Sequence, residues 1–267
     1  MGRRVALTAA ILLTVATHVY GQAEDVADVA SQDLRAGADQ NKHYFLIGPK
    51  AGAAEPKEGY RLVVVMPGGG GTADFLPFVK RIFKNALTER YLVAELVAVK
   101  WTPGQQVVWP TATTPAEKQQ FSTEDFIRAV IDDVRTRHRL DDRFIFTLSW
   151  SSSGPAAYAI SLQDRTPVTG SFVAMSVFKP DQLASLERAK GHPYFLYHSP
   201  EDRVCPFRMA EAARDALTKQ GATVQLATYA GGHGWRGNVY ADIRRGIEWL
   251  ERSVPAQAKP GQTTESL

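Results

Sequence analysis

Runs of apolar residues recur along the chain between amphipathic and polar segments, which predicts a sheet with helices between its strands. The strongest helix pattern covers residues 123–139, where apolar positions repeat at helical spacing and Ser122 can cap the first turn. A second helix is expected over residues 207–220. Seven runs of strand-like composition are expected to form the sheet: residues 43–47, 61–66, 92–100, 143–148, 171–176, 193–198 and 223–229.

This alternation indicates a single domain of the α/β class with a mostly parallel central sheet flanked by helices. A chain of 267 residues with 44% hydrophobic residues can bury one sizeable core, and no internal repeat divides it. Only residues 181–190 separate two of the later strands, so no large lid is expected there. The longest irregular segment is instead residues 101–120.

The two ends of the chain differ from this domain. Residues 1–21 combine Arg3 and Arg4 with a short apolar stretch, which predicts a secretory signal peptide, with an uncleaved anchor as the alternative. Residues 22–42 are polar and alanine-rich, and we expect a short helix or a mobile leader before a domain over 43–254. Residues 255–267 have the composition of a disordered tail. The protein is therefore expected to be exported.

Charge and cysteine content exclude several classes of function. The formal charge of +3 falls to +1 when residues 1–21 are removed, because that segment holds two arginines and no acid. No basic stripe with interleaved aromatics indicates a nucleic-acid partner. Cys205 is the only cysteine, so no intrachain disulfide can form, and it is expected to be packed. No metal-ligand spacing is present, and no cofactor is expected.

The first segment with candidate chemistry is a serine run between a strand and a helix. An apolar strand ends at residue 148, a helix pattern starts at residue 155, and Ser149, Ser151 and Ser153 lie between them. A reversal this tight forces its central residue into a strained backbone and needs small neighbours two positions away. Ser151 fits the central position best. Ser149 and Ser153 remain alternatives, and a serine-rich helix cap is the plain structural interpretation.

Two later segments supply an acid and a base. Asp202 follows the strand over residues 193–198, with Glu201 as the neighbouring alternative. His233 follows the last strand and is enclosed by glycines, which let a loop approach a site closely. A carboxylate can fix the tautomer of an imidazole and stabilise its protonated form. Serine, aspartate and histidine in this order predict nucleophilic catalysis, with Ser151, Asp202 and His233 as the candidate catalytic residues.

Acyl transfer also needs hydrogen-bond donors for an oxyanion, and a glycine-rich turn over residues 67–71 follows an early strand. The lysine and hydroxyl residue of a phosphate-binding loop are missing, as is the spacing of a dinucleotide fingerprint. The backbone N–H groups of Gly69 and Ser152 are therefore the predicted oxyanion hole.

Together these motifs resemble the α/β-hydrolase superfamily of serine hydrolases, and within it the compact extracellular esterases: feruloyl and acetylxylan esterases, polyhydroxyalkanoate depolymerases and relatives similar to dienelactone hydrolase. The resemblance covers residues 44–250 and rests on four segments: 66–71, 149–154, 202–206 and 231–235. The chain departs from the family pattern at Ser149 and Ser153, where glycines are usual, and at Pro67, where a histidine is usual. The resemblance implies the α/β-hydrolase fold.

The resulting hypothesis is a secreted serine hydrolase that cleaves small or polymer-linked carboxylic esters through an acyl-enzyme. A peptidase similar to prolyl oligopeptidase and a non-catalytic binding protein of the same fold are the alternatives. Trp109, Trp150 and Phe178 are the candidate substrate-binding residues, although aromatics in an irregular loop such as Trp109 are equally explained as core. The identity of the acyl and alcohol groups and the oligomeric state stay open.

Overall fold

The computed structural model describes residues 24–49 and 52–254. The expected signal peptide and the expected disordered tail therefore lie outside the described residues. The described part is one α/β domain, as predicted.

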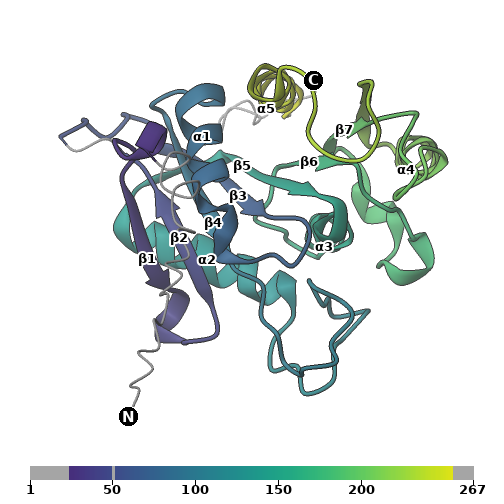
Figure 1. Ribbon diagram of the computed structural model, residues 1–267, viewed down its shortest axis with the longest axis horizontal. Coiled ribbons are helices and arrows are strands. Elements are labelled where there is room, and N and C mark those ends of the chain that lie inside the picture. Colours follow the sequence, from purple (N-terminus) through teal and green to yellow (C-terminus); the bar gives the residue numbers. More distant parts are fainter. Residues whose placement is uncertain (1–23, 50–51, 255–267) are drawn as a thin grey trace, which may run out of the picture.

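A single sheet of eight strands forms the centre of the domain, in the order β1-β2-β4-β3-β5-β6-β7-β8 (Figure 1). The strands from β4 to β8 in this order run parallel, whereas β1 with β2 and β2 with β4 run antiparallel. The carboxyl ends of parallel strands share one edge of the sheet, and loops after them can converge on one site. The strands are β1 Ser31–Arg35, β2 His43–Ile47, β3 Tyr60–Met66, β4 Tyr91–Leu96, β5 Leu140–Trp150, β6 Gly170–Ala174, β7 Pro193–His198 and β8 Thr223–Thr228.

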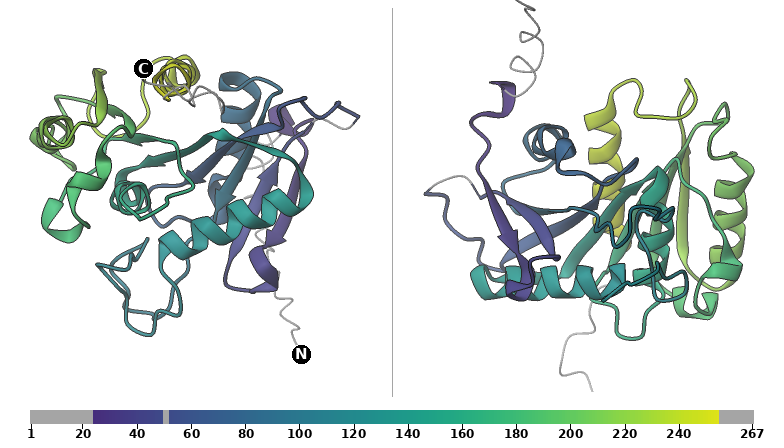
Figure 2. Two further views of the ribbon diagram at one scale, coloured as in Figure 1. Left: turned by 180° about the vertical axis from the view of Figure 1, so that it is seen from behind. Right: turned by 60° about the horizontal axis from the view of Figure 1, so that its bottom comes forward.

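Helices cover both faces of the sheet, which is why the inner strands β3, β4 and β7 are buried along nearly their whole length rather than at every second residue. One face packs against α1 and α5, and the other packs against α2, α3 and α4. Figure 2 shows the long α2 crossing the sheet when the molecule is seen from behind. The helices are α1 Leu76–Ala86, α2 Thr123–Arg137, α3 Gly154–Ser161, α4 Arg208–Lys219 and α5 Val239–Ser253.

The helix predicted over residues 123–139 is confirmed as α2, and its start is determined by side chains. Ser122 accepts a hydrogen bond from the backbone N–H of Asp125, whose carboxylate accepts one from the backbone N–H of Ser122. This reciprocal pair satisfies donors that the first helical turn would leave unpaired. The buried side of α2 is its predicted apolar face.

The N-terminal prediction needs a correction. Residues 22–42 were expected to form a leader before a domain starting at residue 43, yet Ser31–Arg35 form β1, whose residues pair with those of β2. The strand lies at the edge of the sheet and is half exposed, so its polar sequence lacks the apolar pattern of an inner strand. The domain therefore begins before residue 43.

None of the helices within residues 24–49 and 52–254 is long and apolar enough to cross a bilayer. Between β4 and α2, residues 97–122 contain no helix or strand and form a loop that projects at the bottom of Figure 1. The long irregular segment expected from the sequence is thus present.

Candidate active site

Ser151 stands at the sharp turn between β5 and α3. Its φ of +55° lies in the left-handed region, which a side chain of this kind rarely adopts outside strained functional positions. Helix α3 begins at Gly154, where an added Cβ would lie 2.0 Å from Ser176 Oγ. That hydroxyl donates to the carbonyl oxygen of Ser151 at 2.5 Å. The start of α3 and the segment after β6 are therefore so close that only glycine fits at residue 154.

The structure separates the three serines that the sequence left open. The hydroxyl of Ser149 is buried and donates to the carbonyl of Phe172 at 3.2 Å. The hydroxyl of Ser153 is also buried and donates to the carbonyl of Met66 at 2.6 Å. Both hydroxyls therefore form structural hydrogen bonds that link the serine turn to neighbouring strands. Only Ser151 faces a base, because its Oγ lies 3.0 Å from His233 Nε2.

His233 and Asp202 complete a chain of hydrogen bonds. Loops after β8 and β7 bring them together, and the distance from His233 Nδ1 to Asp202 Oδ2 is 2.8 Å. Because a carboxylate only accepts, Nδ1 carries the hydrogen, and Nε2 is free to accept from the hydroxyl of Ser151. Glu201, the alternative acid, instead accepts a hydrogen bond from the backbone N–H of Gly231 at 3.1 Å.

The Asp202 carboxylate is buried and remains well hydrogen-bonded. Its Oδ1 accepts from the backbone N–H groups of Val204 and Cys205, both at 2.8 Å. Burial by itself would raise the pKa of Asp202, but the hydrogen bonds from His233, Cys205 and Val204 outweigh it and hold that pKa below its ordinary value. Asp202 is thus a stable anion beside the imidazole.

The glycine-rich turn after β3 lies against the serine turn. Gly69 has a φ of +58°, and the hydroxyl of Ser152 donates to its carbonyl oxygen at 2.9 Å. This contact brings together the two segments whose backbone N–H groups are the predicted oxyanion donors. Gly71 must also lack a side chain, because a Cβ there would lie 2.6 Å from the Cβ of Ala98.

The three aromatic residues predicted to contact substrate are buried, and this corrects the expectation. Trp109, Trp150 and Phe178 are only 2%, 5% and 5% exposed. The indole N–H of Trp109 donates to the carbonyl of Pro67 at 2.9 Å, and this hydrogen bond stabilises the first residue of the glycine-rich turn. The ring of Phe178 packs edge-on against Tyr158. These side chains are core, the alternative that the sequence allowed for Trp109.

A recess beside the glycine turn was not anticipated from the sequence. It has a volume of about 240 Å³ and connects the turn with the loop after β4. Gln105 shapes this loop: its amide donates to the carbonyls of Val99 and Val107, and its oxygen accepts from the backbone N–H of Trp101. A glutamine in an irregular segment carries no sequence signal for such a role. The recess is lined by Gly70, Thr72, Ala98, Val99, Lys100, Gln105 and Val108.

One group of side chains in the described ranges has donor atoms close enough to share a metal ion, and it belongs to the same site. The donors of Asp202, Cys205 and His233 lie within 4.8 Å of one another. Burial raises the pKa of the Cys205 thiol to about 11, so the thiolate that a metal would require is disfavoured. Cys205 is buried and free, in agreement with its predicted packing.

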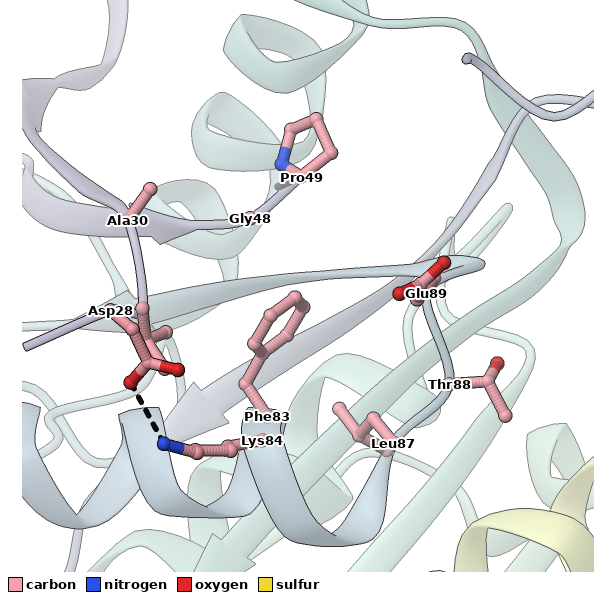
Figure 3. A pocket seen from close by; sticks show the side chains of 10 residues that line it. Asp28, Ala30, Gly48, Pro49, Phe83, Lys84, Leu87, Thr88 and Glu89 are labelled. Atoms are coloured by element: carbon pink, nitrogen blue, oxygen red, sulfur yellow. Dashed lines mark hydrogen bonds and ion pairs between the residues drawn. The ribbon is translucent and has the colours of Figure 1, made fainter. Parts of the chain in front are cut away.

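A separate cavity of about 130 Å³ lies away from these residues (Figure 3). It is formed by the segment before β1, the end of β2 and the turn between α1 and β4, and Lys84 and Asp28 form an ion pair at its wall. The turn that precedes β4 lies at the sheet edge opposite to the carboxyl ends of the parallel strands. The cavity is therefore remote from Ser151.

No family model matches the chain, and no curated protein matches it in sequence. Solved structures do match. The carbohydrate esterase from gut microbiota, in a truncated form, shares 12% identity at a TM-score of 0.63 and covers 84% of this chain and 96% of its own.

Esterase 2 of Thermogutta terrifontis, phosphonylated by sarin, shares 13% identity at a TM-score of 0.58, covering 82% of this chain and 92% of its own. The Bacillus cereus carboxylesterase shares 15% identity at a TM-score of 0.55, covering 88% of this chain and 98% of its own. The chain has the α/β-hydrolase fold. At these identities the likeness establishes the fold alone.

Proposed function

We propose that this protein is a serine hydrolase that cleaves carboxylic esters. The observation that carries the proposal is the chain of contacts from Ser151 Oγ to His233 Nε2 at 3.0 Å and from His233 Nδ1 to Asp202 Oδ2 at 2.8 Å. Its serine stands on a strained turn, its histidine is partly exposed, and its aspartate is fully buried. This is the arrangement that activates a hydroxyl for attack on an acyl carbon.

In the proposed reaction, Ser151 Oγ bonds to the acyl carbon while its proton moves to His233 Nε2. Asp202 stabilises the imidazolium, and the backbone N–H groups of Gly69 and Ser152 stabilise the negative oxygen of the tetrahedral intermediate. His233 then protonates the alcohol as the ester bond breaks. Water repeats the sequence on the acyl-enzyme, releasing the acid and regenerating the Ser151 hydroxyl.

The proposed substrates are small or polymer-linked esters. The recess beside Gly70 offers room for one arm of such an ester, next to the proposed oxyanion donors. The solved relatives named a carbohydrate esterase and a carboxylesterase support an ester rather than an amide as the bond cleaved. We also propose that the protein is exported, on the basis of the N-terminal pattern of a basic pair followed by an apolar stretch.

The test combines covalent labelling with turnover. The wild-type protein is treated with a fluorophosphonate and assayed against a panel of p-nitrophenyl esters and peptide p-nitroanilides. We expect labelling at Ser151 and turnover of esters only. Ser151→Ala should abolish labelling and lower kcat by up to about a millionfold, as removal of a triad nucleophile does.

Ser149→Ala and Ser153→Ala are the matched controls, since both replace a serine of the same turn. They should still label, although each loses a buried hydrogen bond and some stability. Labelling that persists in Ser151→Ala would show that another serine is the nucleophile. Turnover of the amides would support the peptidase alternative, and a folded protein without label or turnover would be a binding protein.

A further inference from the structure

His198, the last residue of β7, contacts the turn that holds Asp202. Its side chain is 2% exposed and its ring packs edge-on against Phe207. The ring atom Nε2 lies 2.7 Å from the carbonyl oxygen of Cys205. A carbonyl oxygen only accepts hydrogen bonds, so Nε2 carries a hydrogen and donates it. From the sequence, His198 is only the last residue of the strand predicted over residues 193–198. Its position four residues before the candidate acid Asp202 is the sequence feature that could have indicated a role.

The same nitrogen also faces the acid of the proposed catalytic chain. His198 Nε2 lies 3.3 Å from Asp202 Oδ2, the oxygen that His233 Nδ1 also contacts. Both backbone groups of Cys205 are thus hydrogen-bonded: its N–H donates to Asp202 Oδ1, and its carbonyl oxygen accepts from His198 Nε2. The contacts form a closed ring of three residues around the carboxylate.

The charge state of His198 matters because it shares an anion with His233. The titratable groups that act on its ring are Asp202 and His233, and Cys205 contacts it through its backbone carbonyl. Burial lowers the pKa of His198 and outweighs the attraction of Asp202. A neutral ring donates a hydrogen bond without neutralising Asp202, so the full negative charge remains available to the imidazolium of His233.

We propose that His198 is a positioning residue for the reaction: a neutral ring, protonated on Nε2, that clamps the turn over residues 202–205 and holds Asp202 in line with His233. The inference rests on the proposed ester hydrolysis, since a positioning role has meaning only if this chain of residues is catalytic. His198 touches no substrate. It acts through Cys205 and Asp202.

The kinetic test uses His198→Phe, which keeps a ring but removes the donor, and His198→Gln, which restores a neutral N–H donor. We expect His198→Phe to lower kcat about 10- to 100-fold with little change in KM, because the buried carbonyl of Cys205 loses its donor and the turn that carries Asp202 is no longer held. The acid limb of the kcat/KM profile should move to lower pH, because an Asp202 that is no longer held in line with His233 stabilises its imidazolium less. His198→Gln should recover most of both changes.

His192→Phe is the matched control. His192 is also a buried histidine next to β7, but its Nε2 contacts the hydroxyl of Ser171 at 3.0 Å, away from the acid turn. It should show a comparable loss of stability with wild-type kcat and an unchanged pH profile. Equal losses in His192→Phe and His198→Phe that His198→Gln does not recover would mean that His198 only packs.

A measurement on the unaltered protein tests the geometry without activity. In ¹⁵N-labelled protein at pH 6.5, where a free imidazole is half protonated, imidazole NMR should show His198 mostly neutral with its hydrogen on Nε2. A hydrogen on Nδ1 only, or a doubly protonated ring, would overturn the proposal. If His198→Phe does not fold, this NMR spectrum and the kcat of His198→Gln test the positioning role. Absence of ester turnover and of Ser151 labelling in the wild type would overturn the proposed function instead.

Discussion

Glu95 in β4 offers a quantitative test of how burial controls ionisation in this fold. The side chain is fully buried, and both carboxyl oxygens lack a hydrogen-bond partner among the described residues. Burial raises the pKa of Glu95 from 4.5 to about 9. In the folded state the group is therefore protonated at neutral pH, whereas the unfolded chain ionises it.

The sign and size of the effect follow from linkage. Between pH 4.5 and about 9 the folded state binds more protons than the unfolded state, so the free energy of unfolding falls as pH rises through this window. The slope is about 1.4 kcal/mol per pH unit. At pH 7, about 2.5 units above the unfolded value, the stability lost relative to a non-ionising side chain is about 3 kcal/mol.

Glu95→Gln has the same shape and does not ionise. We expect it to match the wild type near pH 4.5 and to be more stable by about 3 kcal/mol at pH 7. Urea unfolding followed by tryptophan fluorescence at several pH values measures the difference. Glu95→Leu is a second non-ionising variant, and its difference from Glu95→Gln should not depend on pH. A difference between Glu95→Gln and the wild type that stays constant from pH 5 to pH 8 would refute the reasoning.

Three further predictions concern the serine turn, the core and the N-terminus. Gly154→Ala should lower the free energy of unfolding by about 1 to 3 kcal/mol and reduce fluorophosphonate labelling of Ser151, because the added Cβ would lie 2.0 Å from Ser176 Oγ. Adding Ser176→Gly to this variant should recover part of the stability and part of the labelling. A Gly154→Ala protein with unchanged stability and full labelling would contradict the packing argument. Trp109→Ala should cost about 3 to 5 kcal/mol in urea unfolding yet keep the relative rates among esters, whereas a changed preference at unchanged stability would make it a substrate contact. The exported protein should begin near Gln22 or Glu24 on N-terminal sequencing, and an intact start of the printed sequence would exclude cleavage.

Local patterns in the sequence were sufficient for the main elements and for the order of the chemistry. The apolar run before Met66 could only be an inner strand, and the serines between a strand and a helix required a tight turn. Capping at Ser122 was readable because a cap depends on residues three positions apart. These features are determined by neighbours along the chain, so the sequence contains them directly.

Tertiary contacts decided the remainder. The spacing favoured Ser151 but left Ser149 and Ser153 as alternatives, and the positions of Phe172, Met66 and His233 in space distinguish the three. The polar strand β1 exists because β2 offers an edge to pair with, which no local pattern announces.

The same holds for side chains whose surroundings come from distant segments. Trp109 can be buried because the carbonyl of Pro67 accepts its indole N–H, and Glu95 is held neutral because helices and strands exclude water from it. Burial and long-range hydrogen bonds depend on which segments meet. The sequence by itself thus determined the inner strands, the longest of the central helices and the candidate catalytic residues, whereas the packed structure decided the edge strand β1, which groups face one another and which carboxylates stay ionised.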